Sequence, residues 1–501
     1  MKRYAVGIDI GTTSVKTLLI SSDGSIVDEA KAEHDLLSIY PNWAEEDAAV
    51  WWRNVKSTLT QITSRNEALV SQISALGVSG MVPAIVMLDV NGEPVRNTVQ
   101  QNDARAIEQI TRISQAIDQD DLYAKTGSTT NQQHVAPRLL WLKENEPDAY
   151  ARTDCIMGSY EYIAYKLTGV KSIEINWAVE SGMYDIHRNV WLHEQFDVLG
   201  LDPGLLPQVN QSMKVMGRVS KTAAEATGLA EGIPVIAGSA DHVASTLAAG
   251  VVQDGDLLIK FGGAGDILYC SDEIKTSREL YFDYHIVPEK YLLNGCMAAS
   301  GSLVKWFVKD IMCKEADDDV FKELDRQAAL VPPASDGLIV LPYFLGEKTP
   351  IFDPTSRGVL FGLTLAHGPG HIFRAILEAV IYGFRHHMDV LEGMALKPRR
   401  VSATNGGAKS EFWCQIAADV LGMKITSFKH HQGSALGVAF LAGMSVGMFD
   451  GWDRINDFLA HAKVYEPDAR NSEIYGRAYR IYRDLYVNLK SYFSGIQKLY
   501  E

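Results

Sequence analysis

Residues Asp9–Lys16 read Asp-Ile-Gly-Thr-Thr-Ser-Val-Lys and join two strand-like segments near the start of a 501-residue chain. The longer stretch Tyr4–Lys31 alternates strand-like runs with this turn and with a second turn at Asp23–Gly24, which predicts an antiparallel meander. The pattern recurs at Leu257–Tyr269, where two strand-like runs flank the turn Gly262–Gly265. We therefore predict an α/β chain whose two halves begin in the same way.

The turn of the first hairpin carries groups that suit a phosphate ligand. Asp9 ends a strand, the turn is rich in hydroxyls and backbone N–H groups, and Lys16 adds a cation. Such a turn can bind phosphate oxygens while the carboxylate binds the accompanying Mg²⁺. A plain hairpin, with Asp9 satisfying local N–H groups, explains the segment equally well in isolation. The second Gly-rich turn favours phosphate binding, because two such hairpins across a cleft are typical of actin-like ATPases.

The rest of the chain mixes strands and helices in both halves. An amphipathic helix with Trp51, Val55 and Leu59 on one face precedes strands at Ile73–Val78 and Ala84–Leu88. The small-residue run in Ala248–Gly255 marks the expected boundary, and the cleft between the halves is the expected ligand site. The second half is predicted to contain a strand at Arg400–Thr404 and helices at His371–Met394, Ser410–Leu421, Ser434–Met448 and Glu473–Tyr492.

Composition and charge exclude several classes of protein. The chain has 47 Lys and Arg against 62 Asp and Glu, a formal net charge of -15, and no dense basic run, so we expect no nucleic acid partner. It has no signal-peptide pattern and no stretch of about 18 uninterrupted apolar residues, which predicts a cytoplasmic protein without a membrane partner. No Gly-Lys pair occurs, which excludes a Walker A loop. The oligomeric state stays open, with a homodimer as one candidate.

Two further segments have both a chemical and a structural interpretation. Val235–His242 reads as a strand, a loop and a helix start, with Asp241 near that start. Asp is a favoured N-cap residue, and the pattern alone favours a cap over a general base that takes the proton of a sugar hydroxyl. Asn405–Ser410 follows an apolar strand, and its glycines would let the backbone approach a ligand closely. An ordinary strand-to-helix turn explains that segment equally well.

A signature near the C-terminal third is the most specific motif of the chain. Gly358–Leu363 is followed, after seven residues, by His371–Glu378, and this pair is similar to the C-terminal signature of the FGGY family of carbohydrate kinases. Trp43–Asp47, Ala136–Trp141 and Leu345–Pro350 are also similar to family segments. From Tyr4 to about Met448 the chain resembles this family, and more particularly its xylulokinase-like branch.

The resemblance implies a fold and a division into domains. The expected fold is α/β, with two actin-like (ribonuclease H-like) ATPase domains and a cleft between them. The N-terminal domain would cover residues 1–248 and form the sugar-binding side. The C-terminal domain would cover residues 249–501 and form the nucleotide-binding side.

The resemblance also implies roles for individual residues. Asp241 would be the catalytic base, which replaces the N-cap interpretation, and Asp9 would be the acidic residue associated with Mg²⁺. ATP would be bound by Thr12, Thr13, Lys16, Gly262, Gly263, Gly301, Lys305, Gly406, Gly407, Ala408 and Glu411. A sugar or polyol would be bound by Val82, Pro83, Asp103, Gln133, Asp241 and His242.

The chain departs from the family pattern at three places. Val82–Pro83 stands where xylulokinases carry Met-His and glycerol kinases Arg-Glu, so one side-chain contact to a hydroxyl of D-xylulose should be missing. Gly263–Ala264 stands where many relatives have Gly-Thr in the second phosphate loop. Backbone N–H groups must therefore make the contact to phosphate that a threonine hydroxyl would otherwise make. Gln101 stands where xylulokinases have an aromatic residue.

We therefore expect an ATP-dependent kinase that phosphorylates a terminal hydroxyl of a small ketose or polyol other than D-xylulose. Two alternatives belong to other classes. One is a nucleotide-driven structural or chaperone protein of the actin and Hsp70 type, against which the kinase signature and Asp103 count. The other is a sugar-binding regulator without catalysis, against which the joint presence of Asp9, Lys16 and Asp241 counts.

Overall fold

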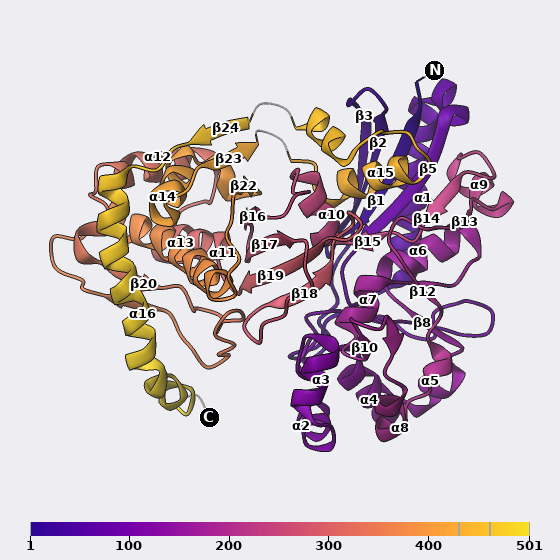
Figure 1. The fold of residues 1–501 in the computed structure, drawn as a ribbon, viewed down its shortest axis with the longest axis horizontal. Helices are drawn as coiled ribbons and strands as arrows, with labels where there is room; N and C mark the ends of the chain where they lie inside the picture. Colours follow the sequence, from indigo (N-terminus) through magenta and orange to yellow (C-terminus); the bar gives the residue numbers. More distant parts are fainter. Residues whose placement is uncertain (1, 429–430, 460–461, 500–501) are drawn as a thin grey trace.

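The molecule consists of two α/β halves that lie side by side, each built around a β-sheet (Figure 1). The computed structural model describes residues 2–428, 431–459 and 462–499. The N-terminal sheet contains, in spatial order, β13 (Val215–Arg218), β14 (Pro234–Ile236), β5 (Ile73–Gly80), β1 (Tyr4–Ile10), β2 (Ser14–Ser21) and β3 (Ile26–Glu33), and β15 (Ser239–Ala240) also pairs with β5.

The C-terminal sheet repeats this strand order. It contains β24 (Ala462–Tyr465), β23 (Ile425–Phe428), β22 (Arg400–Thr404), β16 (Asp256–Phe261), β17 (Gly265–Ser271), β19 (Tyr291–Met297) and β18 (Tyr281–Tyr284). In each half, three antiparallel strands (β1–β2–β3 and β16–β17–β19) are extended by a parallel neighbour of the first strand, β5 or β22. The predicted repeat of the opening meander is confirmed.

Helices pack on both sheets, near the positions that periodicity predicts. α1 (Ala48–Arg65) begins after Asp47, whose carboxylate accepts a hydrogen bond from Ala49 N at 2.8 Å. The apolar face of α1, which includes Trp51, Val55 and Leu59, is buried. In the C-terminal half, α13 (Pro369–Gly393), α14 (Glu411–Leu421) and α16 (Ala469–Gln497) pack against one another.

Shorter elements complete the two halves. The other helices are α2 (Ile107–Ala116), α3 (Gln119–Thr126), α4 (Val135–Asn145), α5 (Pro147–Arg152), α6 (Ser159–Thr168), α7 (Ile175–Glu180), α8 (His193–Leu199), α9 (Lys221–Thr227), α10 (Asp241–Ala248), α11 (Gly301–Trp306), α12 (Asp318–Ala329) and α15 (Ser434–Ser445). The short strands are β4 (Glu45–Glu46), β6 (Val86–Leu88), β7 (Thr98–Val99), β8 (Cys155–Met157), β9 (Ile173–Glu174), β10 (Tyr184–Asp185), β11 (Val190–Trp191), β12 (Val209–Asn210), β20 (Ile339–Leu341) and β21 (Val359–Phe361). Among the residues described, no helix combines the length and the apolar character that crossing a membrane requires.

Helix α15, which comes late in the chain, packs on the N-terminal sheet (Figure 1). It contacts β1, β5 and α10, and its residues 434–443 are buried. Glycines in the sheet allow the close approach, because a Cβ on Gly7 would lie 2.0 Å from Ala435 O and one on Gly77 would lie 2.6 Å from Val438 O. A helix from the end of the chain therefore closes the core of the first half, and our proposed division at residue 248 follows chain order rather than packing.

Candidate active site

A cavity of about 310 Å³ lies between the two halves. Val82, which follows β5, and Gln133, which precedes α4, line it from the N-terminal half. Asp241 and His242, the first two residues of α10, also line it, and residues of β16 to β19 form the opposite wall. Pro83 is buried beside Val82 and does not line the cavity. Four of the residues predicted to bind the substrate therefore share one cavity.

The carboxylate of Asp241 opens into this cavity. Asp241 is the first residue of α10, and Ala240 occupies the N-cap position, so the N-cap interpretation of Asp241 is wrong. The start of the helix is fixed by β15, in which Ser239 pairs with Ser79 of β5. The side chain of Asp241 is 41 % exposed, and its Oδ1 accepts a hydrogen bond from His242 N at 2.6 Å. A rigid backbone thus presents an accessible carboxylate to any ligand in the cavity.

The first hairpin holds a half-buried carboxylate at its base. Asp9 and Lys16 are cross-strand partners on β1 and β2, and Ser79 Oγ donates a hydrogen bond to Asp9 Oδ1 at 2.9 Å. Burial and the nearby Asp241 carboxylate raise the pKa of Asp9 to about 6. Lys16 Nζ donates to Gln432 Oε1 and lies 3.6 Å from Glu29 Oε2.

The remaining residues of the first turn lie between these two charges. Thr12 is half-buried and Thr13 is exposed. The turn is closed by a hydrogen bond of 3.0 Å from Gly11 N to Ser14 O. Both threonine hydroxyls therefore belong to a short loop whose ends are fixed by the sheet.

The second hairpin is held by the start of α11. Gly301 N donates to Gly262 O and Ser300 N donates to Gly263 O, each at 2.8 Å. A Cβ on Gly301 would lie 2.7 Å from Gly262 O, so only glycine fits there without a shift of the hairpin. Gly263 is exposed and has open space around its Cα. Lys305, further along α11, is also exposed.

The predicted adenosine segment follows β22 directly. Gly406 is exposed, Gly407 is half-buried and Ala408 is buried in a short 3₁₀ turn. A Cβ on Gly407 would lie 2.6 Å from Phe261 Cβ, so this segment packs against the strand that leads into the second hairpin. The exposed Glu411 pairs with Lys463 at 2.5 Å.

Asp103, like Pro83, is a predicted substrate residue that does not line the cavity. It is 1 % exposed, and Arg105 Nη2 lies 2.7 Å from its Oδ2. Ala44 N donates to the same oxygen at 2.7 Å. The Arg105 guanidinium in turn stacks over Trp43 at 3.7 Å from the ring centroid. The carboxylate of Asp103 is therefore occupied by protein donors.

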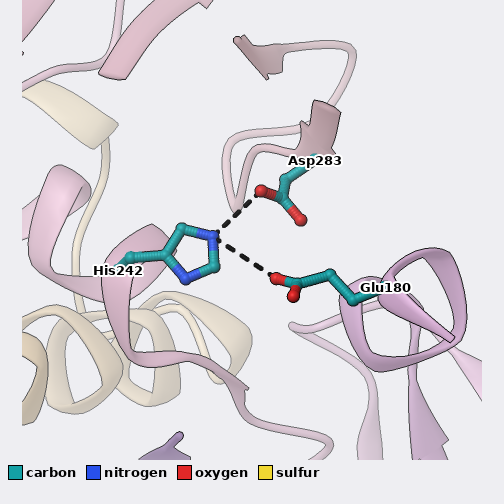
Figure 2. Close-up of side chains that lie close together, drawn as sticks. All are labelled: Glu180, His242 and Asp283. Carbon is teal, nitrogen blue, oxygen red and sulfur yellow. Dashed lines mark hydrogen bonds and ion pairs between the residues drawn. The ribbon is translucent and has the colours of Figure 1, made fainter. Parts of the chain in front are cut away.

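A cluster of three ionisable side chains at the cavity was not predicted from the sequence as a unit. Glu180 at the end of α7 and Asp283 of β18 both point toward the imidazole of His242 (Figure 2). His242 Nε2 lies 2.9 Å from Asp283 Oδ2 and 3.8 Å from Glu180 Oε1. Burial alone would lower the pKa of His242, but Asp283, Asp241 and Glu180 together raise it well above its ordinary value. Burial and Asp283 raise the pKa of Glu180.

Lys260 and Asp266 at the base of the second hairpin were also missed. They are cross-strand partners on β16 and β17, as Asp9 and Lys16 are on β1 and β2, and they form an ion pair of 3.1 Å. The repeat of the hairpin in the sequence was a signal that could have identified this second pair. Both residues line the cavity.

Comparisons with known proteins agree with this architecture. Residues 4–248 match the N-terminal domain model of the FGGY family of carbohydrate kinases, and residues 276–446 match its C-terminal domain model. The crystal structure of xylulose kinase from Rhodospirillum rubrum is 39% identical in sequence, with a TM-score of 0.93 over 98% of this chain and 100% of that chain. Xylulose kinase from Bacillus subtilis is 27% identical over 97% of each chain. Gluconokinase from the same species is 25% identical over 98% of this chain and 96% of its own.

These matches cover nearly the whole chain, and they confirm the predicted class of enzyme and its xylulokinase-like branch. The repeated sheet order is that of the predicted two-domain actin-like ATPase fold, which kinases of this family share. Members of the family use ATP. The chain belongs to the FGGY family of carbohydrate kinases and is a sugar kinase.

Proposed function

We propose that this sugar kinase transfers the γ-phosphoryl group of ATP to a terminal hydroxyl of a small ketose or polyol, with Asp241 as the base. The position of Asp241 carries the proposal. Its carboxylate opens into the cavity, and it interacts electrostatically with Asp9 of the first hairpin and Lys260 of the second. A carboxylate in this position can accept the proton of the attacking hydroxyl, while positioning and electrostatics supply most of the catalysis.

The nucleotide is proposed to lie along the two hairpins and the segment after β22. Exposed backbone at Gly263 and Gly406 supports this, because N–H groups there can reach phosphate and ribose oxygens. Phosphates would be bound by Thr12, Thr13, Lys16, Gly262 and Gly263, and adenosine by Gly301, Lys305, Gly406, Gly407, Ala408 and Glu411.

Mg²⁺ fits the surroundings of Asp9. Burial and the neighbouring Asp241 raise the pKa of Asp9 to about 6, because Ser434, Ser79 and the cation of Lys16 offset these two effects only in part. When bound, Mg²⁺ would neutralise charge on the phosphates and beside both carboxylates. We propose that Asp9 holds this ion, directly or through water, and that Ser79 keeps the carboxylate in place.

The substrate is proposed to differ from D-xylulose. Val82 lines the cavity with an apolar side chain that is 6 % exposed, so this position offers no side-chain donor or acceptor. The names of the relatives, xylulose kinase and gluconokinase, support a small polyhydroxylated substrate. We propose a ketose or polyol of four to six carbons whose hydroxyls do not require a partner at Val82.

A panel assay tests the proposal. ADP release is measured with D-xylulose, D-ribulose, xylitol, ribitol, erythritol, glycerol and gluconate, and we expect sugar-dependent release with at least one ketose or polyol. If D-xylulose has the highest kcat/KM, the interpretation of Val82 is wrong. ATP turnover that no sugar stimulates would instead support the nucleotide-driven alternative, and sugar binding without ADP release would support a regulator.

A further inference from the structure

The cavity wall around His242 is built from three separate elements. Glu180 comes from α7, His242 from α10 and Asp283 from β18, and their polar atoms converge on one point at the cavity (Figure 2). Asn294 of β19 stands beside Asp283 and donates a hydrogen bond to its Oδ2. All four residues line the cavity.

This wall has more acceptors than donors. His242 Nε2 can donate one hydrogen bond, and Asp283 Oδ2 at 2.9 Å receives it. Asp283 Oδ1 and Asn294 Oδ1 are buried without a hydrogen-bond partner in the described part of the protein, and the residues are 1 % and 7 % exposed. No described residue donates to the Glu180 carboxylate at hydrogen-bonding distance, because Nε2 lies 3.8 Å away. Buried acceptors without donors are costly, and these two oxygens of Asp283 and Asn294 expose almost no surface, so a small rotation of the side chains toward a ligand that brings donors is favoured here.

We propose that Asp283 and Glu180, with Asn294 Oδ1, form a specificity-determining subsite that accepts hydrogen bonds from the substrate's non-reacting hydroxyls. This inference rests on the proposed function. Val82 cannot make a side-chain hydrogen bond to the substrate. The inference assigns this contact to Asp283, Glu180 and Asn294 instead. The substrate class it implies is one with hydroxyls at carbons beyond the reacting one.

The orientation of the imidazole determines which hydroxyls these are. Nδ1 of His242 faces Asp241 Oδ1 at 3.5 Å, whereas Nε2 faces Asp283. The reacting hydroxyl lies at Asp241, so a hydroxyl at Asp283 is separated from it by the width of the ring. His242 therefore lies between the base and the subsite, and the substrate chain must pass along the imidazole.

A divalent cation is the competing occupant of the same cluster. A metal would need the lone pair of His242 Nε2, whereas that nitrogen donates its proton to Asp283 Oδ2. The surrounding carboxylates raise the pKa of His242 well above its ordinary value despite its burial, which keeps Nε2 protonated. Hydroxyl donors require no such deprotonation.

The test combines variants with substrate analogues. For the best ketose or polyol of the panel, kcat/KM is measured with the parent compound and each singly deoxygenated analogue, in wild type and in Asp283→Asn and Glu180→Gln. Asp283→Asn should lower kcat/KM for the parent about 10- to 100-fold, which is the loss expected for a hydrogen bond to a charged group. One analogue should lose a similar factor in wild type and nothing further in the variant.

Controls separate recognition from folding. Asp185→Asn changes another buried carboxylate, which accepts from His187 N and Arg188 N at 2.9 Å outside the cavity, and it should leave the ranking of analogues unchanged. Asp283→Glu should restore part of the discrimination. Unchanged KM for ATP in Asp283→Asn would show that the nucleotide side is intact.

Two results would overturn the inference. One is an equal loss for the parent and every analogue in both variants, which indicates a structural role. The other is stoichiometric Mn²⁺ binding to the nucleotide-free protein that Asp283→Asn abolishes and Asp9→Asn does not. Wild-type enzyme that releases ADP with no compound of the panel would contradict the proposed function itself, which is a separate outcome.

Discussion

In each of the two hairpins at the start of the two sheets, a charged cross-strand pair lies one pair before the turn, but the order of the charges is opposite. On β1 and β2, Asp9 comes first and faces Lys16, whereas on β16 and β17, Lys260 comes first and faces Asp266. The second pair closes into an ion pair of 3.1 Å. Among the described residues, Asp9 and Lys16 form no such pair, because Ser79 binds Asp9 and Gln432 binds Lys16.

The difference shows how one structural unit can serve two purposes. Burial would raise the pKa of Asp266, but Lys260, Cys296 and His242 together outweigh it and the net shift is downward. The pKa of Asp9 rises to about 6 because burial and Asp241 outweigh the lowering effects of Ser434, Ser79 and Lys16. The first hairpin therefore keeps a carboxylate that needs a cation from the ligand, while the second is already neutral and offers exposed backbone.

The largest loss of turnover is expected when Asp241 is substituted, because charges of both hairpins interact with this residue. Asp241→Asn keeps the shape but cannot take a proton, so turnover should fall by about 10² to 10⁴ while ATP and sugar still bind. Single-turnover kinetics and calorimetric binding measure the two effects. Wild-type turnover in the variant would show that the carboxylate is not the base.

Asp9→Asn should separate stability from activity at the first hairpin. The folded-state pKa of about 6 exceeds the ordinary 3.8, so the protonated form favours folding and this contribution is lost as the pH rises through 6. Asn mimics the protonated form. The variant should be more stable than wild type at pH 8 by about 3 kcal/mol, with the difference vanishing below pH 4.

The same variant should lose most of its turnover, because it has no carboxylate for Mg²⁺. Thermal unfolding without nucleotide and with EDTA, at pH 4 and pH 8, measures the stability difference. Asp23→Asn serves as the control, because the carboxylate of Asp23 is on the surface, where it pairs with Lys2. An Asp9→Asn variant that is less stable than wild type at pH 8 would contradict the assignment of an uncompensated charge to Asp9.

Asp266→Asn should weaken the second hairpin without removing chemistry. Lys260 would remain largely buried with no partner on the neighbouring strand, which costs about 1 to 3 kcal/mol of folding stability. We expect a smaller loss of turnover than for Asp9→Asn, since the carboxylate of Asp266 neutralises the charge of Lys260 and does not bind a ligand. Denaturant unfolding and steady-state kinetics measure both quantities. A loss of turnover equal to that of Asp9→Asn would mean that the hairpins are equivalent.

The smallest effect on catalysis, a change in KM for ATP, is expected from methyl groups added in or beside the second hairpin. Gly301→Ala would place Cβ 2.7 Å from Gly262 O and displace the loop, which should raise KM for ATP several-fold. Gly263→Ala meets open space and should change KM for ATP less than twofold. Equal values for the two variants would show that the position of the second turn does not control nucleotide binding.

The sequence predicted those parts of the fold that depend on local patterns. The meander at Tyr4–Lys31 and its repeat were predicted from alternation and turn residues, and β22 was predicted with its observed bounds. The long helix predicted at His371–Met394 spans Pro369–Gly393, since periodicity marks a buried face better than it marks helix ends. The packing of α15 on the first sheet was not predicted, because an apolar helix shows that it is buried but not where.

The site was predictable only where its residues adjoin a motif. Asp241 and His242 lie at a recognisable strand-to-helix junction, whereas Glu180 and Asp283 lie in short elements far from it in sequence. No spacing rule connects such residues, and only the tertiary fold brings them to one imidazole. For Asp103, the sequence did not reveal that Arg105, two residues later, would occupy the carboxylate.

The position of α15 has a consequence for synthesis on the ribosome. The glycines of β1 and β5 are made early, but the helix that covers them is completed only at residue 445. One apolar face of the first sheet therefore stays uncovered by α15 until most of the chain has been translated. Nascent chains arrested before residue 434 should be cleaved by protease within the N-terminal half, and chains arrested far enough beyond 445 to expose α15 should resist.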